Sequence, residues 1–236
     1  MIKKRDLSLS LLAWCCALLP FLTIHVCYLV SASYGHVEWC VPHWDACTSI
    51  SATGRQMPEK LLFKLGMIPS ALLTAWLWWR IRQWLVTRLP GTPLSSTLVP
   101  GLLAAFFLIL YTLALGVEGD TYQGIRRIGV TLSFAFTFLA QLQCTRLFGK
   151  LARASNASQS IIYWQKRLFW LLSCLLLTGL ISVILDAWMG IAYDSLEDAF
   201  EWNMALMLQL WFAGAAVLLS KTAEIQRLRN DSGMAH

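Results

Sequence analysis

The chain has 236 residues, of which 57% are hydrophobic and only 14% are charged. A soluble domain carries about a quarter charged residues, so this composition excludes one and predicts a membrane protein whose apolar runs cross the bilayer as helices. The runs are continuous and do not alternate, which excludes a membrane β-barrel. The net charge of +6 comes without basic–aromatic interleaving or a phosphate-binding glycine loop, so we expect no nucleic-acid partner.

The first predicted elements are a basic N-terminus and an apolar run over residues 7–30. This run is too long for the apolar region of a signal peptide, so we predict an uncleaved first span. A polar loop over residues 32–60 separates it from a second span over 61–79. This loop is the longest polar interval between two apolar spans, and most of the recognisable motifs fall in it or face it.

Four further apolar runs follow. They cover residues 98–117, 125–147, 168–191 and 199–220. Together the six runs predict an all-α, polytopic membrane protein, with residues 1–236 forming a single six-helix transmembrane domain.

Charged residues are sorted between the two sides of this predicted bundle. The N-terminus, the two connectors after the second and fourth spans, and the tail hold 14 of the 19 Lys and Arg residues, whereas the opposite ends hold 10 of the 13 acids. Because Lys and Arg are retained on the cytoplasmic side, we predict that both termini are cytoplasmic and that the loop over 32–60 is not.

The polar loop contains two cysteines, Cys40 and Cys47. In an oxidising compartment they are able to form a disulfide; free thiols, or a metal site with His43 and Asp45, are the alternatives. Zinc sites usually use two closely spaced ligand pairs, and here there is no second pair, so we predict the disulfide and expect no metal and no cofactor.

Acidic and basic residues at the non-cytoplasmic ends are the candidate site residues. Glu201 lies deeper than a helix cap requires, and an ionisable residue inside a span is a functional candidate, usually with a partner. The expected partners are Arg126 and Arg127, at the start of the fourth span, and the expected ligand is a lipid head group. Further ligand-binding candidates are Arg55 for a lipid phosphate, Glu59, and Trp202 beside Glu201. The weak catalytic candidates are Glu59, Glu201, His43 and His25.

Three short patterns occur along the chain in a fixed order. They are Thr53-Gly54 followed by Pro58-Glu59, Phe63 and Gly66; Arg126 followed by Gly129 and Phe134; and Glu201-Trp202. Together they resemble the DRAM/Frag/Sfk family of six-span membrane proteins, which includes autophagy modulators and proteins that remodel the lipid of GPI anchors. Two positions depart from the family pattern: Met57 stands in place of a proline, and Arg126 in place of the usual histidine.

The resemblance implies a role in lipid handling or membrane homeostasis on the non-cytoplasmic face. The compact loops look bacterial, which predicts the bacterial inner membrane, a periplasmic loop and no GPI substrate. We therefore expect a protein that binds or organises membrane lipids. The alternatives are a lipid-modifying enzyme that uses Glu59 or Glu201 as general base, and a small transporter, which the absence of a visible inverted repeat disfavours. Whether the protein is an enzyme, and which protein partners it has, stays open.

Overall fold

The structure, a computed structural model, describes residues 2–89, 95–154 and 159–231, with the side chains of 8–89, 97–153 and 159–225. All regular elements within these residues are helical, as predicted. The α-helices are α1 (Ile2–Ser33), α2 (Pro42–Asp45), α3 (Glu59–Val86), α4 (Ser95–Ala114), α5 (Asp120–Ala154), α6 (Gln159–Met189) and α7 (Asp194–Asp231), and the 3-10 helices are η1 (Ala52–Gly54) and η2 (Gly190–Tyr193).

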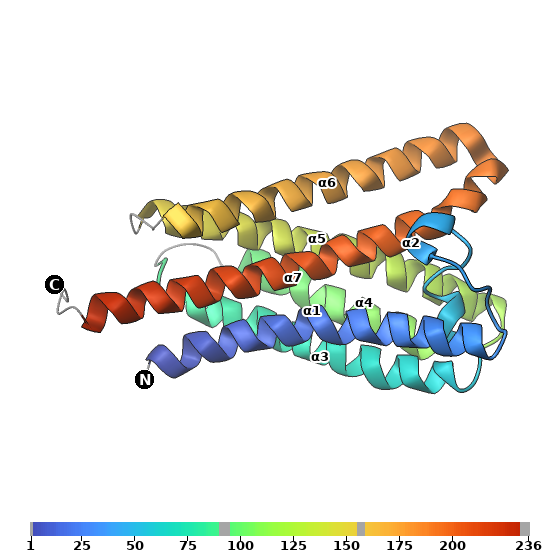
Figure 1. Ribbon diagram of the computed structural model, residues 1–236, viewed down its shortest axis with the longest axis horizontal. Coiled ribbons are helices and arrows are strands. Elements are labelled where there is room, and N and C mark those ends of the chain that lie inside the picture. Colours follow the sequence, from blue (N-terminus) through green and yellow to red (C-terminus); the bar gives the residue numbers. More distant parts are fainter. Residues whose placement is uncertain (1, 90–94, 155–158, 232–236) are drawn as a thin grey trace.

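Five helical segments of the described chain are long and apolar enough to cross a membrane, which confirms a multi-pass membrane protein. The last segment, Gln159–Ile225, includes both α6 and α7, because only the short η2 separates them. The prediction of six separate spans is therefore not confirmed by length and composition. The chain reverses direction at η2, where Gly190 has a φ of 55° that L side chains rarely adopt, and α7 runs back beside α6 (Figure 1).

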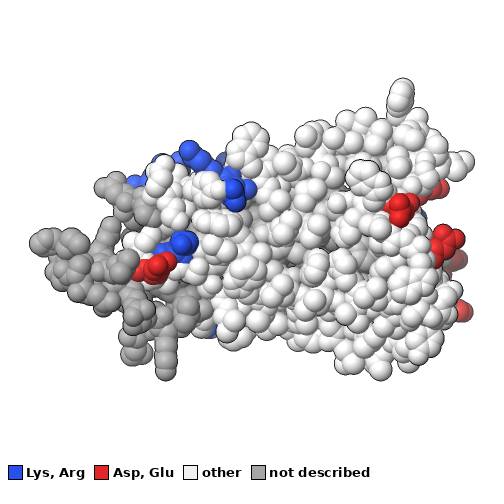
Figure 2. All heavy atoms as spheres, in the orientation of Figure 1, with Lys and Arg blue, Asp and Glu red and all other residues white. Residues whose placement is uncertain are grey.

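The long helices run roughly parallel to one another, and α1 begins at the end of the bundle where α7 terminates (Figure 1). The connection between α1 and α3 covers the other end. On the face shown in Figure 2, most of the visible Asp and Glu atoms lie at this covered end, and the Lys and Arg atoms lie near the opposite end, with one acidic side chain beside them. The described basic and acidic side chains are therefore concentrated at opposite ends of the bundle, as the sequence predicted. The side chains of Lys3, Lys4, Arg5, Arg227 and Arg229 lie outside the described residues.

Two clusters of buried side chains form the core. The larger one lies toward the end where the chain begins and is built around Trp78, Phe148 and Trp211. The smaller one lies under the α1–α3 connection and includes Phe63 and Trp202. Burial of such aromatic side chains contributes much of the free energy that stabilises a core. The site described below therefore lies against tightly packed side chains.

One long helix differs from the others in burial. α6 packs along α5 and α7, but many of its large apolar side chains are exposed: Phe169, Trp170, Leu176, Leu177, Leu180, Ile181, Val183, Ile184 and Trp188. In a membrane these side chains face lipid, where exposure of apolar atoms carries no penalty.

Candidate functional site

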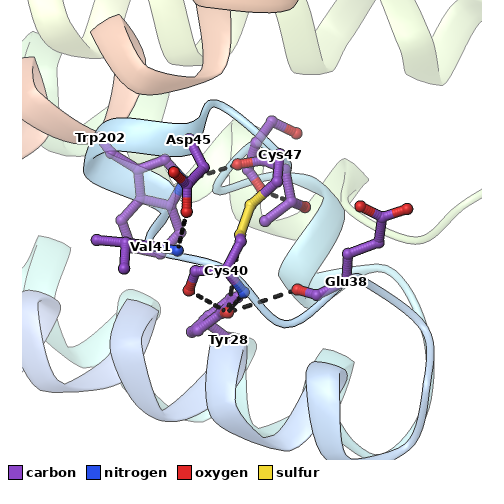
Figure 3. The surroundings of a disulfide bond; sticks show 9 residues. Tyr28, Glu38, Cys40, Val41, Asp45, Cys47 and Trp202 are labelled. Carbon is purple, nitrogen blue, oxygen red and sulfur yellow. Dashed lines mark hydrogen bonds between the residues drawn. A yellow bond between two sulfur atoms is a disulfide. The ribbon is translucent and has the colours of Figure 1, made fainter.

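The cap loop, residues 34–58, closes one end of the bundle between α1 and α3. It contains the Cys40–Cys47 disulfide, as predicted. The Tyr28 hydroxyl of α1 donates to the Cys40 carbonyl at 2.7 Å and accepts from the Cys40 N–H at 2.8 Å, while the Asp45 carboxylate accepts from the Val41 N–H at 2.7 Å (Figure 3). The cap loop is thereby fixed to α1.

Three consecutive residues of α7 hold the other side of the cap loop. The Glu201 carboxylate accepts the Ile50 N–H at 3.3 Å. The Trp202 indole N–H donates to the Thr48 carbonyl at 2.8 Å, and the Asn203 amide donates to the His43 carbonyl at 2.8 Å. The Glu-Trp pattern of the sequence therefore joins α7 to the cap loop.

His25 and His43 meet beneath this junction. Their Nε2 atoms are 3.2 Å apart, and both rings lie edge-on to the Trp202 ring. Burial, and secondarily the neighbouring His25, lowers the pKa of His43 from its ordinary value, which favours the neutral imidazole that a His–His hydrogen bond requires.

The alternative metal ligands of the cap loop are used otherwise. Cys40 and Cys47 are bonded to each other, and His43 contacts His25. In the described chain no group of three or more His, Cys, Asp or Glu side chains is placed to hold a metal ion.

Glu59, the first residue of α3, is fully buried. Its Oε1 lies 2.6 Å from Nδ1 of His36, which comes from the start of the cap loop, and its Oε2 has no hydrogen-bond partner. A substrate has no path to this carboxylate, so its position fits a buried pair better than a general base. His36 was not predicted as a site residue; a lone polar histidine in a loop gives no periodic signal, and only the fold brings it to Glu59.

One of the three basic candidates, Arg126, lies at the C-terminus of α4, together with Lys60, which was not predicted as a site residue. Arg126 donates to the Val117 carbonyl at 2.7 Å, and Lys60 donates to the Gly116 carbonyl at 2.6 Å. Cations at the last carbonyls of a helix satisfy unpaired acceptors and the helix dipole. The expected ion pair of Arg126 with Glu201 is not among the contacts of the described side chains. Arg127 is exposed on α5.

Arg55, the remaining basic candidate, is exposed in the cap loop, and its guanidinium donates to the Ser51 hydroxyl at 2.9 Å. It is therefore placed at the surface and is not among the residues that line the cavity described below.

The residues that carried the family pattern are mostly packing positions. A Cβ on Gly54 would lie 2.7 Å from the Phe63 ring, and a Cβ on Gly129 would lie 2.9 Å from Tyr111 of α4. A Cβ on Gly66 would collide with Thr23 of α1. These glycines permit close approach between elements.

Thr53 and Pro58, which also belong to the family pattern, have other positions. Thr53 is fully buried and donates to the Ile50 carbonyl at 2.8 Å, and Pro58 directly precedes α3.

A cavity of about 90 Å³ lies inside the bundle under the cap loop. Its walls come from α1, α3, α4, α5 and α7, and they are mainly apolar. Ile50 of the cap loop and Glu201 of α7 line it together with Phe63 and Phe134. Of the predicted ligand-binding residues, only Glu201 belongs to the described lining.

Two lining residues that were not predicted are Tyr111 and Gln209. The Tyr111 hydroxyl and Oε1 of Gln209 are buried and lack a hydrogen-bond partner. A polar residue inside an apolar span is a signal for function, but it does not say which residues share one cavity.

Comparison with known proteins gives one finding. The family described as the Frag1/DRAM/Sfk1/Cwh43P N-terminal domain matches residues 8–218, nearly the whole chain, which confirms the resemblance. No curated protein and no solved structure matches. The chain, with its apolar helices and its capped bundle, belongs to the Frag1/DRAM/Sfk1/Cwh43P family of membrane proteins.

Proposed function

We propose that this protein binds a membrane lipid in the cavity under the cap loop, with the lipid's polar end beside Glu201. The observation that carries the proposal is the cavity itself, which has mainly apolar walls and a carboxylate at its capped end. Binding sites for small apolar ligands combine such walls with a few polar groups that fix orientation.

The size of the cavity limits the occupant. An engineered cavity of about 150 Å³ admits benzene, whereas this cavity has about 90 Å³. It therefore suits a slender hydrocarbon chain better than a fused-ring sterol. Its lining residues on α7 run from Glu201 to Phe212, roughly 16 Å apart at the helical rise per residue, and the volume of about 90 Å³ within that span holds only a short part of one chain.

The proposal includes an orientation in the membrane. We place the cap loop on the non-cytoplasmic side, with both termini in the cytoplasm and α6 and α7 as two separate spans, because this arrangement agrees with the distribution of Lys and Arg along the sequence. The bacterial inner membrane, with a periplasmic cap loop, is the compartment that we infer from the compact loops. A role in organising or remodelling lipids would follow from the bound lipid.

The test compares two substitutions in α4, one at a residue that lines the cavity and one at a residue on the outside of the bundle. Ala105 is 4% exposed and lines the cavity, whereas Leu102, one turn earlier, is 43% exposed on the outside of the bundle. Protein carrying Ala105→Phe, protein carrying Leu102→Phe and wild type are purified in the same detergent, and their retained lipids are quantified by mass spectrometry.

We expect Ala105→Phe to reduce the retained lipid per protein at least fivefold and Leu102→Phe to leave it unchanged. Melting temperatures of all three proteins check that each is folded. Equal retention in the folded Ala105→Phe protein would show that the cavity is not the binding site.

A further inference from the structure

The polar groups that line the cavity differ in whether they already have hydrogen-bond partners. Several of its hydroxyls are already satisfied within their own helices: Ser70 donates to the Gly66 carbonyl, Thr74 to the Ser70 carbonyl and Thr137 to the Ser133 carbonyl. These hydroxyls therefore need no hydrogen bond from a ligand. Among the described polar groups of the lining, the Glu201 carboxylate and the Tyr111 hydroxyl lie at the capped end.

These two groups have complementary needs. The Tyr111 side chain is 3% exposed, and its hydroxyl has no partner in the described structure. An unpaired buried hydroxyl is unfavourable, and a phenol is a ready donor. Glu201 is only half-buried, and one hydrogen bond, from the Ile50 N–H, reaches its carboxylate. A carboxylate has room for several donors.

Charged head groups fit this end of the cavity poorly. A phosphate or a fatty-acid carboxylate would face the negative charge of Glu201. The neighbouring cations are directed elsewhere: Arg55 donates to the Ser51 hydroxyl, and Lys60 and Arg126 donate to the Gly116 and Val117 carbonyls at the end of α4. A quaternary ammonium has no hydrogen to donate to Glu201 and no lone pair to accept from Tyr111. A hydroxyl both donates and accepts.

We propose that the lipid in this cavity is a neutral single-chain lipid with a hydroxyl head, which donates to the Glu201 carboxylate and accepts from the Tyr111 hydroxyl. The inference rests on the proposed function, because it names the class of lipid that the same cavity takes. The chain then extends from Glu201 toward Phe212, between α1, α3, α4, α5 and α7.

The test uses three probes with the same 16-carbon chain, namely hexadecan-1-ol, its methyl ether and hexadecanoic acid. Each is tritiated, and binding to the full-length protein in detergent is measured by equilibrium dialysis. The ether accepts a hydrogen bond but cannot donate one, and the acid brings a negative charge. We expect the alcohol to bind about tenfold more tightly than either.

Three variants test which residues cause the preference for the alcohol. Glu201→Gln should weaken alcohol binding severalfold while leaving ether binding nearly unchanged, because only the alcohol donates to the carboxylate. Tyr111→Phe should weaken binding of both, because both oxygens accept from the Tyr111 hydroxyl. Tyr111→Phe removes only a hydroxyl without a partner, so it should fold like wild type. Tyr122→Phe, which removes a phenol hydroxyl from a side chain that is 43% exposed and does not line the cavity, is the matched control and should leave the alcohol-to-ether ratio unchanged.

The outcomes separate the two proposals. If alcohol and ether bind equally, or the acid binds best, and Ala105→Phe abolishes binding of all three, the cavity binds lipid but the hydroxyl inference is wrong. If no probe binds, or Ala105→Phe changes nothing, the lipid-binding proposal fails and the inference fails with it. A tenfold preference for the alcohol that shrinks in Glu201→Gln and persists in Tyr122→Phe, together with weaker binding of both alcohol and ether in Tyr111→Phe, supports the inference.

Discussion

Glu59 and Glu201 lie near the same capped end of the bundle, and each has one carboxylate oxygen engaged with the cap loop. Glu59 is fully buried, and its partner is the ring of His36. Glu201 is half-buried, its partner is the backbone N–H of Ile50, and it lines a cavity. The first carboxylate is enclosed by protein on every side, whereas the second borders empty space.

This difference assigns them different roles. A buried charge is tolerated only when it is paired, so Glu59 and His36 act as an internal tie between α3 and the cap loop. A carboxylate beside a cavity has unused acceptor capacity that a ligand is able to fill. The two sites should therefore respond differently to substitution: changes at Glu59 should affect stability, and changes at Glu201 should affect binding.

The largest effect is expected from His36→Ala, which leaves Glu59 buried without its partner. Breaking a buried pair costs about 3–5 kcal/mol, and we expect the lower end because the His36 side chain is 29% exposed. The apparent melting temperature in detergent measures the loss. Glu201→Gln should cost less than about 1 kcal/mol, since an amide retains an acceptor for the Ile50 N–H.

Glu38→Gln, which alters an exposed carboxylate in the same cap loop, is the control for His36→Ala. If Glu201→Gln lowers the melting temperature as much as His36→Ala does, the contrast between the two carboxylates is wrong.

The next largest effect is expected from Cys47→Ser. The disulfide joins residues seven positions apart, and closing so short a loop is worth about 2.5 kcal/mol in the chain-entropy description. Because the cap loop carries both His36 and Ile50, its loosening should affect both carboxylates. The melting temperature with and without reductant measures this, and Cys174→Ser, at an exposed free cysteine, should have no effect. A reductant-insensitive wild type would contradict the expectation.

Trp202→Phe tests the contact by which α7 holds the cap loop, next to Glu201. It removes the indole donor to the Thr48 carbonyl and retains most of the packing, so the expected loss is about 1–2 kcal/mol. Limited proteolysis should cut the cap loop faster in this variant than in Trp188→Phe, whose side chain is 86% exposed. Equal cleavage rates would mean that α7 does not hold the cap loop through this bond.

The smallest effect is expected from pH. The pKa of His43 is lowered in the folded protein, so the folded state binds its proton less readily than the unfolded chain does. Stability is then fully present above the ordinary histidine value of about 6.5 and declines as the pH falls below it. The melting temperature of wild type should fall between about pH 6.5 and 5 more steeply than that of His43→Gln. Parallel pH profiles would exclude a contribution from His43.

The sequence by itself determined the class of the protein, the ends of the bundle at which charge gathers, and the family. These follow from local properties: long apolar runs must form helices in a bilayer because backbone polar groups need partners, and Thr53-Gly54, Phe63 and Glu201-Trp202 occur in a recognisable order. The Cys40–Cys47 disulfide was also predicted, since both cysteines fall in one short loop that was expected to face an oxidising compartment.

Only the tertiary structure decided which side chains meet. Arg126 was expected to pair with Glu201, but the last carbonyls of α4 lie nearer and require donors, so Arg126 and Lys60 are used there. His36 reaches Glu59, and Tyr111 shares a cavity with Glu201, through contacts between elements distant in the chain. The rotation of each helix about its axis, which the mutual packing of the helices sets, determines these contacts, and nearly uniform apolar spans carry little information about that rotation.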